Sequence, residues 1–182
     1  MYNGKTVLCE VGVGPLSASF GALHWGKPDM HVILIEPHPL YGKELLAAAT
    51  GRSNVEVHNV AIGDEDGITT FYDEGTSSAL DGILSPFRQI RGPRALAPTF
   101  TVDVRKITHY DHGQIDYLRV DTEGAEYYCL KHLVSRPRQI VVEMYDDMAS
   151  YVNPFLYEIE EWAKTCGYKR VAVQDSDFIY QL

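Results

Sequence analysis

The stretch DYLRVDTEGAE, residues 116–126, joins an apolar strand to a helix through a turn that is rich in acids. Asp121, Glu123 and Glu126 lie around Gly124, where the strand is expected to end. Carboxylates next to a buried strand are costly unless they are solvated, paired or used chemically. We therefore interpret this turn as part of a functional edge of an α/β sheet.

Other apolar segments have the composition of buried strands. They are residues 6–10, 30–35, 54–62, 115–120 and 139–142, followed by a closing pair at 171–173 and 178–180. Helical patterns occupy residues 40–49, 125–133 and 155–166. Near-continuous apolar strands indicate burial on both faces, as in a parallel sheet. The alternation predicts an α/β fold, namely a doubly wound, mostly parallel seven-stranded sheet with an antiparallel edge strand, in three α/β/α layers.

The length of 182 residues fits one domain, residues 1–182. Residues 74–98 interrupt the strand–helix rhythm with glycines, serines and prolines. Irregular segments of this length are usually functional or disordered. We expect this insertion to act as a substrate lid.

Composition excludes several classes of protein. A net charge of -9 and a pI near 5.2 argue against a nucleic-acid surface. The sequence shows neither a targeting signal nor an apolar run of membrane length, which predicts a cytoplasmic protein without a membrane partner. Cys9, Cys129 and Cys166 are widely spaced and lack zinc-ligand spacing, so we expect buried thiols in a reducing compartment.

The segment EVGVG, residues 10–14, follows the first strand. Gly12 and Gly14, with Val13 between them, allow a ligand to approach the backbone closely, and the helix expected after this loop would present free amide donors. A Gly-x-Gly pair also occurs in simple turns. Ser17 stands where a dinucleotide-binding pattern requires a third glycine, which favours a ligand without a pyrophosphate. The acid Glu10 would repel a diphosphate and suits an ammonium group.

Glu36 ends the second strand at the right interval to accept hydrogen bonds from both hydroxyls of a ribose, with Pro37 against the base. The alternative is a solvated acid in a rigid turn. Backbone and side-chain groups after the third strand are candidates to bind the edge of a base, although Asn59 alone is equally compatible with a simple turn. These candidates are Asn59, Val60, Ala61 and Ile62.

Asp121 and Glu143 end two further strands, and such ends border the ligand crevice of an open α/β sheet. They are the first two candidates for a catalytic base, and His109 is a weaker third. Glu123 is a candidate to bind substrate, whereas Glu126 equally suits the first turn of a helix. A metal site built from Asp121, Glu123 and Glu143 is conceivable, but no spacing rule requires one, and no metal is predicted.

Three arginines gather in the insertion of this acidic chain, at Arg88, Arg91 and Arg94. Guanidinium groups match carboxylates and phosphates, so these side chains are candidates to bind an anionic substrate, with help from Ser77 and Ser78. A solvated basic loop that balances a negative surface is the alternative.

Several of these segments resemble the FkbM-type S-adenosylmethionine-dependent methyltransferases, a class I, Rossmann-like family. The matching segments are residues 36–37, 59–63, 101–103 and 118–126, and the last is similar to the family's KIDVEGAE block. The resemblance implies that Glu10, Gly12 and Gly14 hold the methionine part, Glu36 the ribose, and residues 59–62 the base. Val13, Ser19, Pro37 and Asp121 are further candidates for cofactor binding. Asp121 would face the reacting centre.

Three features depart from the family pattern. Leu16 stands where the second glycine of the first motif is usual, and Arg119 stands where lysine is frequent, which keeps the charge. The chain also opens almost directly on the first strand, whereas relatives often carry a leading helix. An open cleft, or a cap from another subunit or from residues 74–98, is the expected consequence.

The resemblance implies O-methylation of a hydroxyl on a sugar or another small molecule by in-line displacement, with S-adenosylmethionine as cofactor. The acceptor is expected to be small, such as an anionic sugar or a nucleotide sugar, and a homo-oligomer is compatible with the sequence. Two alternatives remain open. One is a catalytically inactive cofactor-binding partner subunit, and the other is a nicotinamide-dependent oxidoreductase, which Ser17 and Glu10 disfavour.

Overall fold

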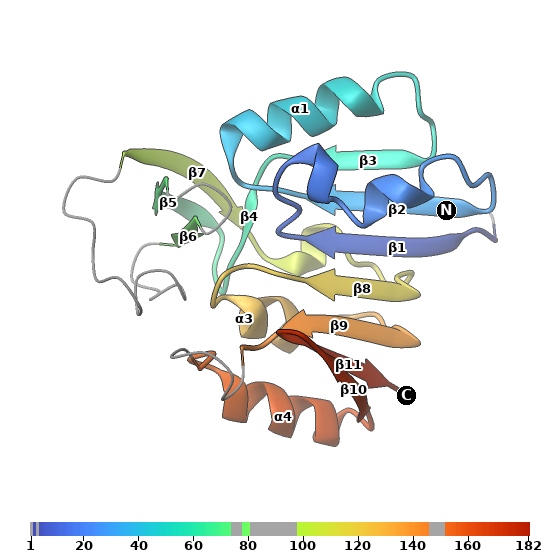
Figure 1. The fold of residues 1–182 in the computed structure, drawn as a ribbon, viewed down its shortest axis with the longest axis vertical. Helices are drawn as coiled ribbons and strands as arrows, with labels where there is room; N and C mark the ends of the chain where they lie inside the picture. The colour runs from blue at the N-terminus through green and yellow to red at the C-terminus, as the bar shows by residue number, and fades with distance from the viewer. Residues whose placement is uncertain (1, 3, 74–77, 81–97, 146–151) are drawn as a thin grey trace.

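The computed structural model describes residues 2, 4–73, 78–80, 98–145 and 152–182 (Figure 1). Its main sheet has seven strands in the order β10-β11-β9-β8-β1-β2-β3. The bounds are β1 Thr6–Val11, β2 Met30–Ile35, β3 Val55–His58, β8 Tyr117–Val120, β9 Gln139–Glu143, β10 Lys169–Gln174 and β11 Asp177–Gln181. Strand β11 is antiparallel to both β9 and β10, and the other paired neighbours are parallel. The predicted sheet is confirmed, with the antiparallel strand one position inside the edge.

Alternate side chains of the strands enter two separate apolar clusters, which gives three layers. Val7, Cys9 and Val11 of β1 pack on one face of the sheet with α3 (Glu126–Lys131), α4 (Leu156–Thr165) and the 3-10 turn η4 (Ile107–His109). Val32 and Leu34 of β2 face the other way. They pack with α1 (Pro39–Ala49) and the 3-10 turns η1 (Leu16–Ala18) and η2 (Gly21–His24).

A second, four-stranded sheet lies beyond the carboxyl ends of the parallel strands (Figure 1). Its order is β4-β7-β5-β6, with β4 Ala61–Ile62, β5 Gly67–Tyr72, β6 Ala79–Leu80 and β7 Thr99–Arg105. Strand β4 is parallel to β7, whereas β5 pairs with β6 and β7 in the antiparallel sense. This sheet was not expected from the sequence, and it forms one side of the functional site.

The expected third strand, residues 54–62, is corrected by the structure. The chain leaves the main sheet after His58 and joins the second sheet at Ala61. The Asn59 side-chain amide donates hydrogen bonds to the carbonyls of Glu36 and Pro37, at 2.7 and 3.2 Å. These contacts fix the chain where it passes from one sheet to the other.

The helices follow the predicted segments with local differences. Helix α1 begins after His38, whose ring accepts from the Leu40 amide, and has proline in its first turn. The helix expected after the glycine loop is replaced by η1 and η2. Helix α4 begins at Leu156, and the Asn153 side chain shortly before it accepts from the Phe155 amide and donates to Glu126. None of the helices in the described ranges is long and apolar enough to span a membrane.

Candidate functional site

A cavity of about 330 Å³ opens at the carboxyl edge of the main sheet. Its walls are the loops that follow β1, β2, β8 and β9, together with β4 and β5 of the second sheet. The strands β1 and β8 are also tied at this edge, since the Asp121 amide donates to the Val11 carbonyl at 2.9 Å. This is the position at which open α/β sheets bind ligands.

The glycine loop lines the cavity through Gly12, Val13 and Gly14. Gly12 and Gly14 have φ values of +78° and +67°, which favour glycine. A Cβ on Gly12 would overlap the main-chain carbonyl of Asp121, so the loop passes directly against the acidic turn. The two segments can be this close only because position 12 has no side chain.

Glu36 lines the cavity and is 4% exposed. Its carboxylate accepts from the Gly14 amide and from the His38 amide, both at 2.7 Å. Burial raises the pKa of Glu36, and these two amides act against that rise. Glu36 therefore supports the glycine loop while its carboxylate borders the ligand space, and Pro37 lies beside it in the cavity wall.

Glu10 is placed differently from the expectation. It is fully buried, and the cavity wall formed by described residues does not include it. Its carboxylate accepts from the Ser19 hydroxyl at 2.9 Å, the Phe20 amide at 3.0 Å and the Gly21 amide at 2.8 Å. The geometry does not match direct cofactor binding by Glu10 or Ser19. Both residues support the loop from the side away from the cavity, because the Glu10 carboxylate accepts hydrogen bonds from free amides at the start of the second 3-10 turn.

Strand β4 brings Val60, Ala61 and Ile62 to the cavity wall, as proposed for a base-binding segment. Asn59 does not belong to the described wall, because its side-chain amide is engaged with the carbonyls of residues 36–38. Recognition of a base by the Asn59 side chain is therefore disfavoured.

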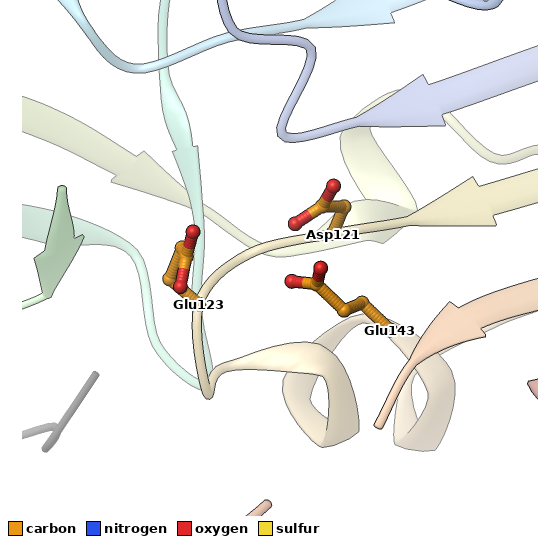
Figure 2. A group of neighbouring side chains, drawn as sticks. All are labelled: Asp121, Glu123 and Glu143. Carbon is orange, nitrogen blue, oxygen red and sulfur yellow. The ribbon is translucent and has the colours of Figure 1, made fainter. Parts of the chain in front are cut away.

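Asp121, Glu123 and Glu143 converge from the β8 turn and the end of β9 (Figure 2). One carboxylate oxygen from each lies within 4.8 Å of the others. Burial, followed by a hydrogen bond with Asp121, raises the pKa of Glu143 well above its ordinary value. A cluster of three carboxyl groups can accept hydrogen bonds, take up a proton or attract a cation, whether organic or metallic.

The backbone conformation is unusual at the acidic end of the cavity, where Asp121, Glu123 and Glu143 converge. Glu123 and Tyr145 have φ values of +57° and +45°, in the left-handed region that residues other than glycine rarely adopt. Both residues line the cavity. Such outliers concentrate at functional sites, where the surrounding structure holds them.

The other predicted site residues differ in their relation to the cavity. His109 is on η4 outside the described cavity wall, and its ring is 2.7 Å from Asp66, so a role as catalytic base is not supported by its position. Ser78 lines the cavity. The remaining candidates for substrate binding fall outside the described residues: Ser77, Arg88, Arg91 and Arg94.

Several lining residues were not singled out from the sequence. Arg119 reaches the acidic end, and His38, Tyr41 and Phe71 form an aromatic side of the cavity. The His38 ring stacks on Tyr41 with centroids 4.3 Å apart. The position of His38, next to Glu36-Pro37, was a usable signal, whereas Phe71 belongs to the second sheet that was not predicted.

Comparison with known proteins identifies the family to which these residues are similar. The model of the methyltransferase FkbM domain matches residues 17–170, which include Glu36 and the acidic turn. No protein of curated function matches the sequence.

Two solved structures resemble the fold. Fibrillarin from Aeropyrum pernix, whose structure contains natively bound S-adenosyl-L-methionine, has 12% identity and a TM-score of 0.52 over 98% of the chain. The chain spans 66% of that fibrillarin. The antibiotic-resistance methyltransferase Kmr has 13% identity and a TM-score of 0.50, with 99% of the chain and 88% of Kmr covered. At these identities the likeness concerns the fold.

Proposed function

The chain belongs to the FkbM methyltransferase family, and from this we propose that it methylates a hydroxyl oxygen of a small, sugar-like molecule. It is a methyltransferase, and its cofactor is S-adenosylmethionine. The observation that carries the proposal is the single cavity that brings together the glycine loop, Glu36 and the carboxylates of Asp121 and Glu143. One side of this cavity suits a nucleoside, and the other suits a hydroxyl group that must lose its proton.

The residues of the cavity fit this cofactor. Because Gly12 has no side chain, the glycine loop packs directly on the Asp121 carbonyl, and both segments line the cavity. Glu36 would hold the ribose hydroxyls, and Val60, Ala61 and Ile62 would lie along the base. The acids of the cavity suit a ligand with positive charge. When bound, S-adenosylmethionine supplies a methyl group on a sulfonium.

We assign different roles to the two best-placed acids. The raised pKa of Glu143 keeps it protonated near neutral pH, so it can donate a hydrogen bond to Asp121 or to the acceptor. Asp121 then serves as the base that takes the acceptor proton. General base catalysis of this kind contributes roughly 10²–10⁴-fold, and alignment of the reacting groups supplies about 7–11 kcal/mol of the barrier.

The chemistry of the acceptor follows from the same acids. Hydroxyl groups can donate to Asp121, Glu123 and Glu143, as a sugar ring would require. An anionic group would be repelled by these carboxylates, so on an acidic sugar it has to lie away from them. The proposal therefore favours a neutral polyhydroxylated face next to the transferred methyl group.

Calorimetry tests the cofactor side. We expect S-adenosylmethionine and its demethylated product to bind, and NAD not to bind. E36Q should weaken binding of both nucleosides by about 10-fold or more, because a hydrogen bond to a charged group contributes roughly 1.5–3 kcal/mol. The matched control is E161Q, whose carboxylate is half-exposed on α4.

Turnover with a panel of glycosides that differ in free hydroxyls tests the acceptor side. D121N should bind the cofactor but lose about 100-fold or more in kcat. Binding of NAD with no binding of S-adenosylmethionine would contradict the cofactor assignment. Methylation of amines but not of any hydroxyl would contradict the acceptor assignment alone.

A further inference from the structure

One guanidinium group lies among carboxylates from three strands of the main sheet, namely β1, β8 and β11. Nη1 of Arg119 is 3.5 Å from Glu10 of β1, and Nη2 is 3.4 Å from Asp121 at the end of β8. Nη2 is also 3.6 Å from Asp177 of β11. Glu143 of β9 is the fourth acid that acts on Arg119.

The sheet fixes this arrangement. Glu10 and Arg119 are register partners in the β1–β8 pair, and Asp177 is the register partner of Glu143 in the β11–β9 pair. Side chains at paired positions lie on the same face of a sheet. The cation is therefore positioned by four adjacent strands and not by a mobile loop.

Burial makes the balance of charge at this point important. Only 24% of the Arg119 side chain is exposed, and the pKa of Arg119 is raised because the attraction of Asp121, Asp177, Glu10 and Glu143 outweighs the effect of burial. Burial raises the pKa of Asp177, and Arg119 acts against that rise. Without the guanidinium, these acids would face one another with little solvent between them.

We propose that Arg119 is a positioning residue for methyl transfer, which holds the cofactor loop through Glu10 and the acceptor-side carboxylate through Asp121 at the same time. The inference rests on the proposed function. Glu10 anchors residues 19–21 of the loop region, and Asp121 borders the reacting end of the cavity. One side chain thus contacts carboxylates on both halves of the site.

R119Q tests the coupling because it removes the charge and keeps a polar side chain. We expect kcat to fall about 100-fold, in the range of a lost general base. The affinity for S-adenosylmethionine should also fall, but by less than about fivefold, since Glu10 loses the guanidinium and keeps its bonds to Ser19, Phe20 and Gly21. A large effect on kcat with a small effect on cofactor binding separates positioning from general damage.

The pH profile gives a second readout. The groups that face the guanidinium or its partners are Glu10, Asp121, Glu123, Glu143, Tyr145 and Asp177. A nearby cation favours the ionised form of a carboxylic acid, so removal of the guanidinium in R119Q should move the acidic limb of kcat against pH to higher pH, by about one unit. R119K keeps the positive charge but lacks the planar guanidinium that can bond two carboxylates at once. It should therefore restore the position of the acidic limb and part of kcat.

A double variant and a matched control complete the test. R119Q/D177N lacks one of the repelling acids and should be more active than R119Q, which also covers the case in which R119Q folds poorly. R138Q removes an arginine that pairs with Asp116 at 3.3 Å near the amino ends of the strands, and it should leave activity unchanged.

Two results would overturn the inference. One is kcat of R119Q within twofold of the wild type. The other is a lower kcat in R119Q whose pH profile keeps its acidic limb in place, together with no recovery of kcat in R119K or R119Q/D177N. That combination would mean that Arg119 has a purely structural role. Failure of the proposed function is distinct, because the wild-type protein would then not bind S-adenosylmethionine by calorimetry.

Discussion

At the scale of single residues, neighbouring acids and glycines with similar sequence signals have different roles. Glu10 is the penultimate residue of β1 and Glu36 directly follows β2, but the Glu10 carboxylate is turned into the loop that it supports, whereas Glu36 borders the cavity. Gly12 and Gly51 both have φ near +80°, but only Gly12 lies against another main chain. The environment of each residue, and not its type, determines its role.

G12A tests the contact between the glycine loop and the acidic turn. The added Cβ would overlap the Asp121 carbonyl, so the loop must shift, and we expect a loss of at least about 3 kcal/mol in unfolding free energy together with loss of cofactor binding. G51A is the matched control, because its φ is +80° and nothing lies within 4 Å of the added Cβ. It should cost about 1 kcal/mol from backbone strain alone. Urea unfolding and calorimetry measure both effects, and equal losses in the two variants would contradict the argument.

At the scale of elements, the turn between β8 and α3 is held by one buried carboxylate. Glu126 is 1% exposed and accepts from the Thr122 amide at 2.9 Å, the Gly124 amide at 3.0 Å and the Asn153 side chain at 2.7 Å. Burial raises the pKa of Glu126. The turn that carries Asp121 and Glu123 is thereby tied to the segment before α4, which explains why this part of the sequence is so rich in acids.

E126Q tests this tie. A glutamine presents one acceptor and one donor where the carboxylate presents two acceptors, so one of the donors at Thr122, Gly124 or Asn153 loses its partner. We expect a loss of about 2–3 kcal/mol in unfolding free energy and weaker cofactor binding. E158Q, an exposed acid in the first turn of α4, should change the unfolding free energy by less than about 0.5 kcal/mol. An E126Q variant with unchanged unfolding free energy and unchanged cofactor binding would show that the turn between β8 and α3 does not depend on the Glu126 carboxylate.

At the scale of the whole molecule, the carboxyl edge of the sheet concentrates buried negative charge. Burial raises the pKa values of Glu10, Glu36, Glu126, Glu143 and Asp177. Each acid binds its proton more tightly in the folded protein than in the unfolded chain. The contribution of these groups to the unfolding free energy is therefore greatest at a pH below their ordinary pKa values, and it is lost as the pH rises through their raised pKa values.

Thermal unfolding of the ligand-free protein tests this sign. The pKa of Glu143 is raised beyond neutral pH, so Tm should be higher at pH 7 than at pH 8.5. A difference of about 1 kcal/mol corresponds to roughly 2–4 °C for a chain of this size. E143Q should flatten the dependence, whereas E158Q should keep it. A Tm that rises between pH 7 and pH 8.5 would contradict the interpretation.

Much of the fold and part of the site followed from local patterns. Apolar runs such as residues 30–35 identified the strands, and the acids at positions 36, 121 and 143 were expected at one edge because parallel strands end there together. The second sheet was missed although β7 alternates Phe100, Val102 and Val104 with polar residues, because β4 and β6 have only two residues each and the pairing of β5 with β7 joins segments that are separate along the chain. The helix expected after the glycine loop was wrong, because buried Glu10 supplies acceptors that favour two short 3-10 turns there.

The sequence by itself determined the layered α/β architecture, the position of the ligand edge and the family, since periodicity and strand-end residues are local properties. Only the tertiary structure decided that Glu10 supports the loop from behind, that Asn59 fixes the passage to the second sheet, and that Arg119 lies among four acids. The physical reason is that these roles depend on register and side-chain direction between segments far apart in the chain. Arg119 and Asp177, for example, are brought together only by the strand order of the sheet.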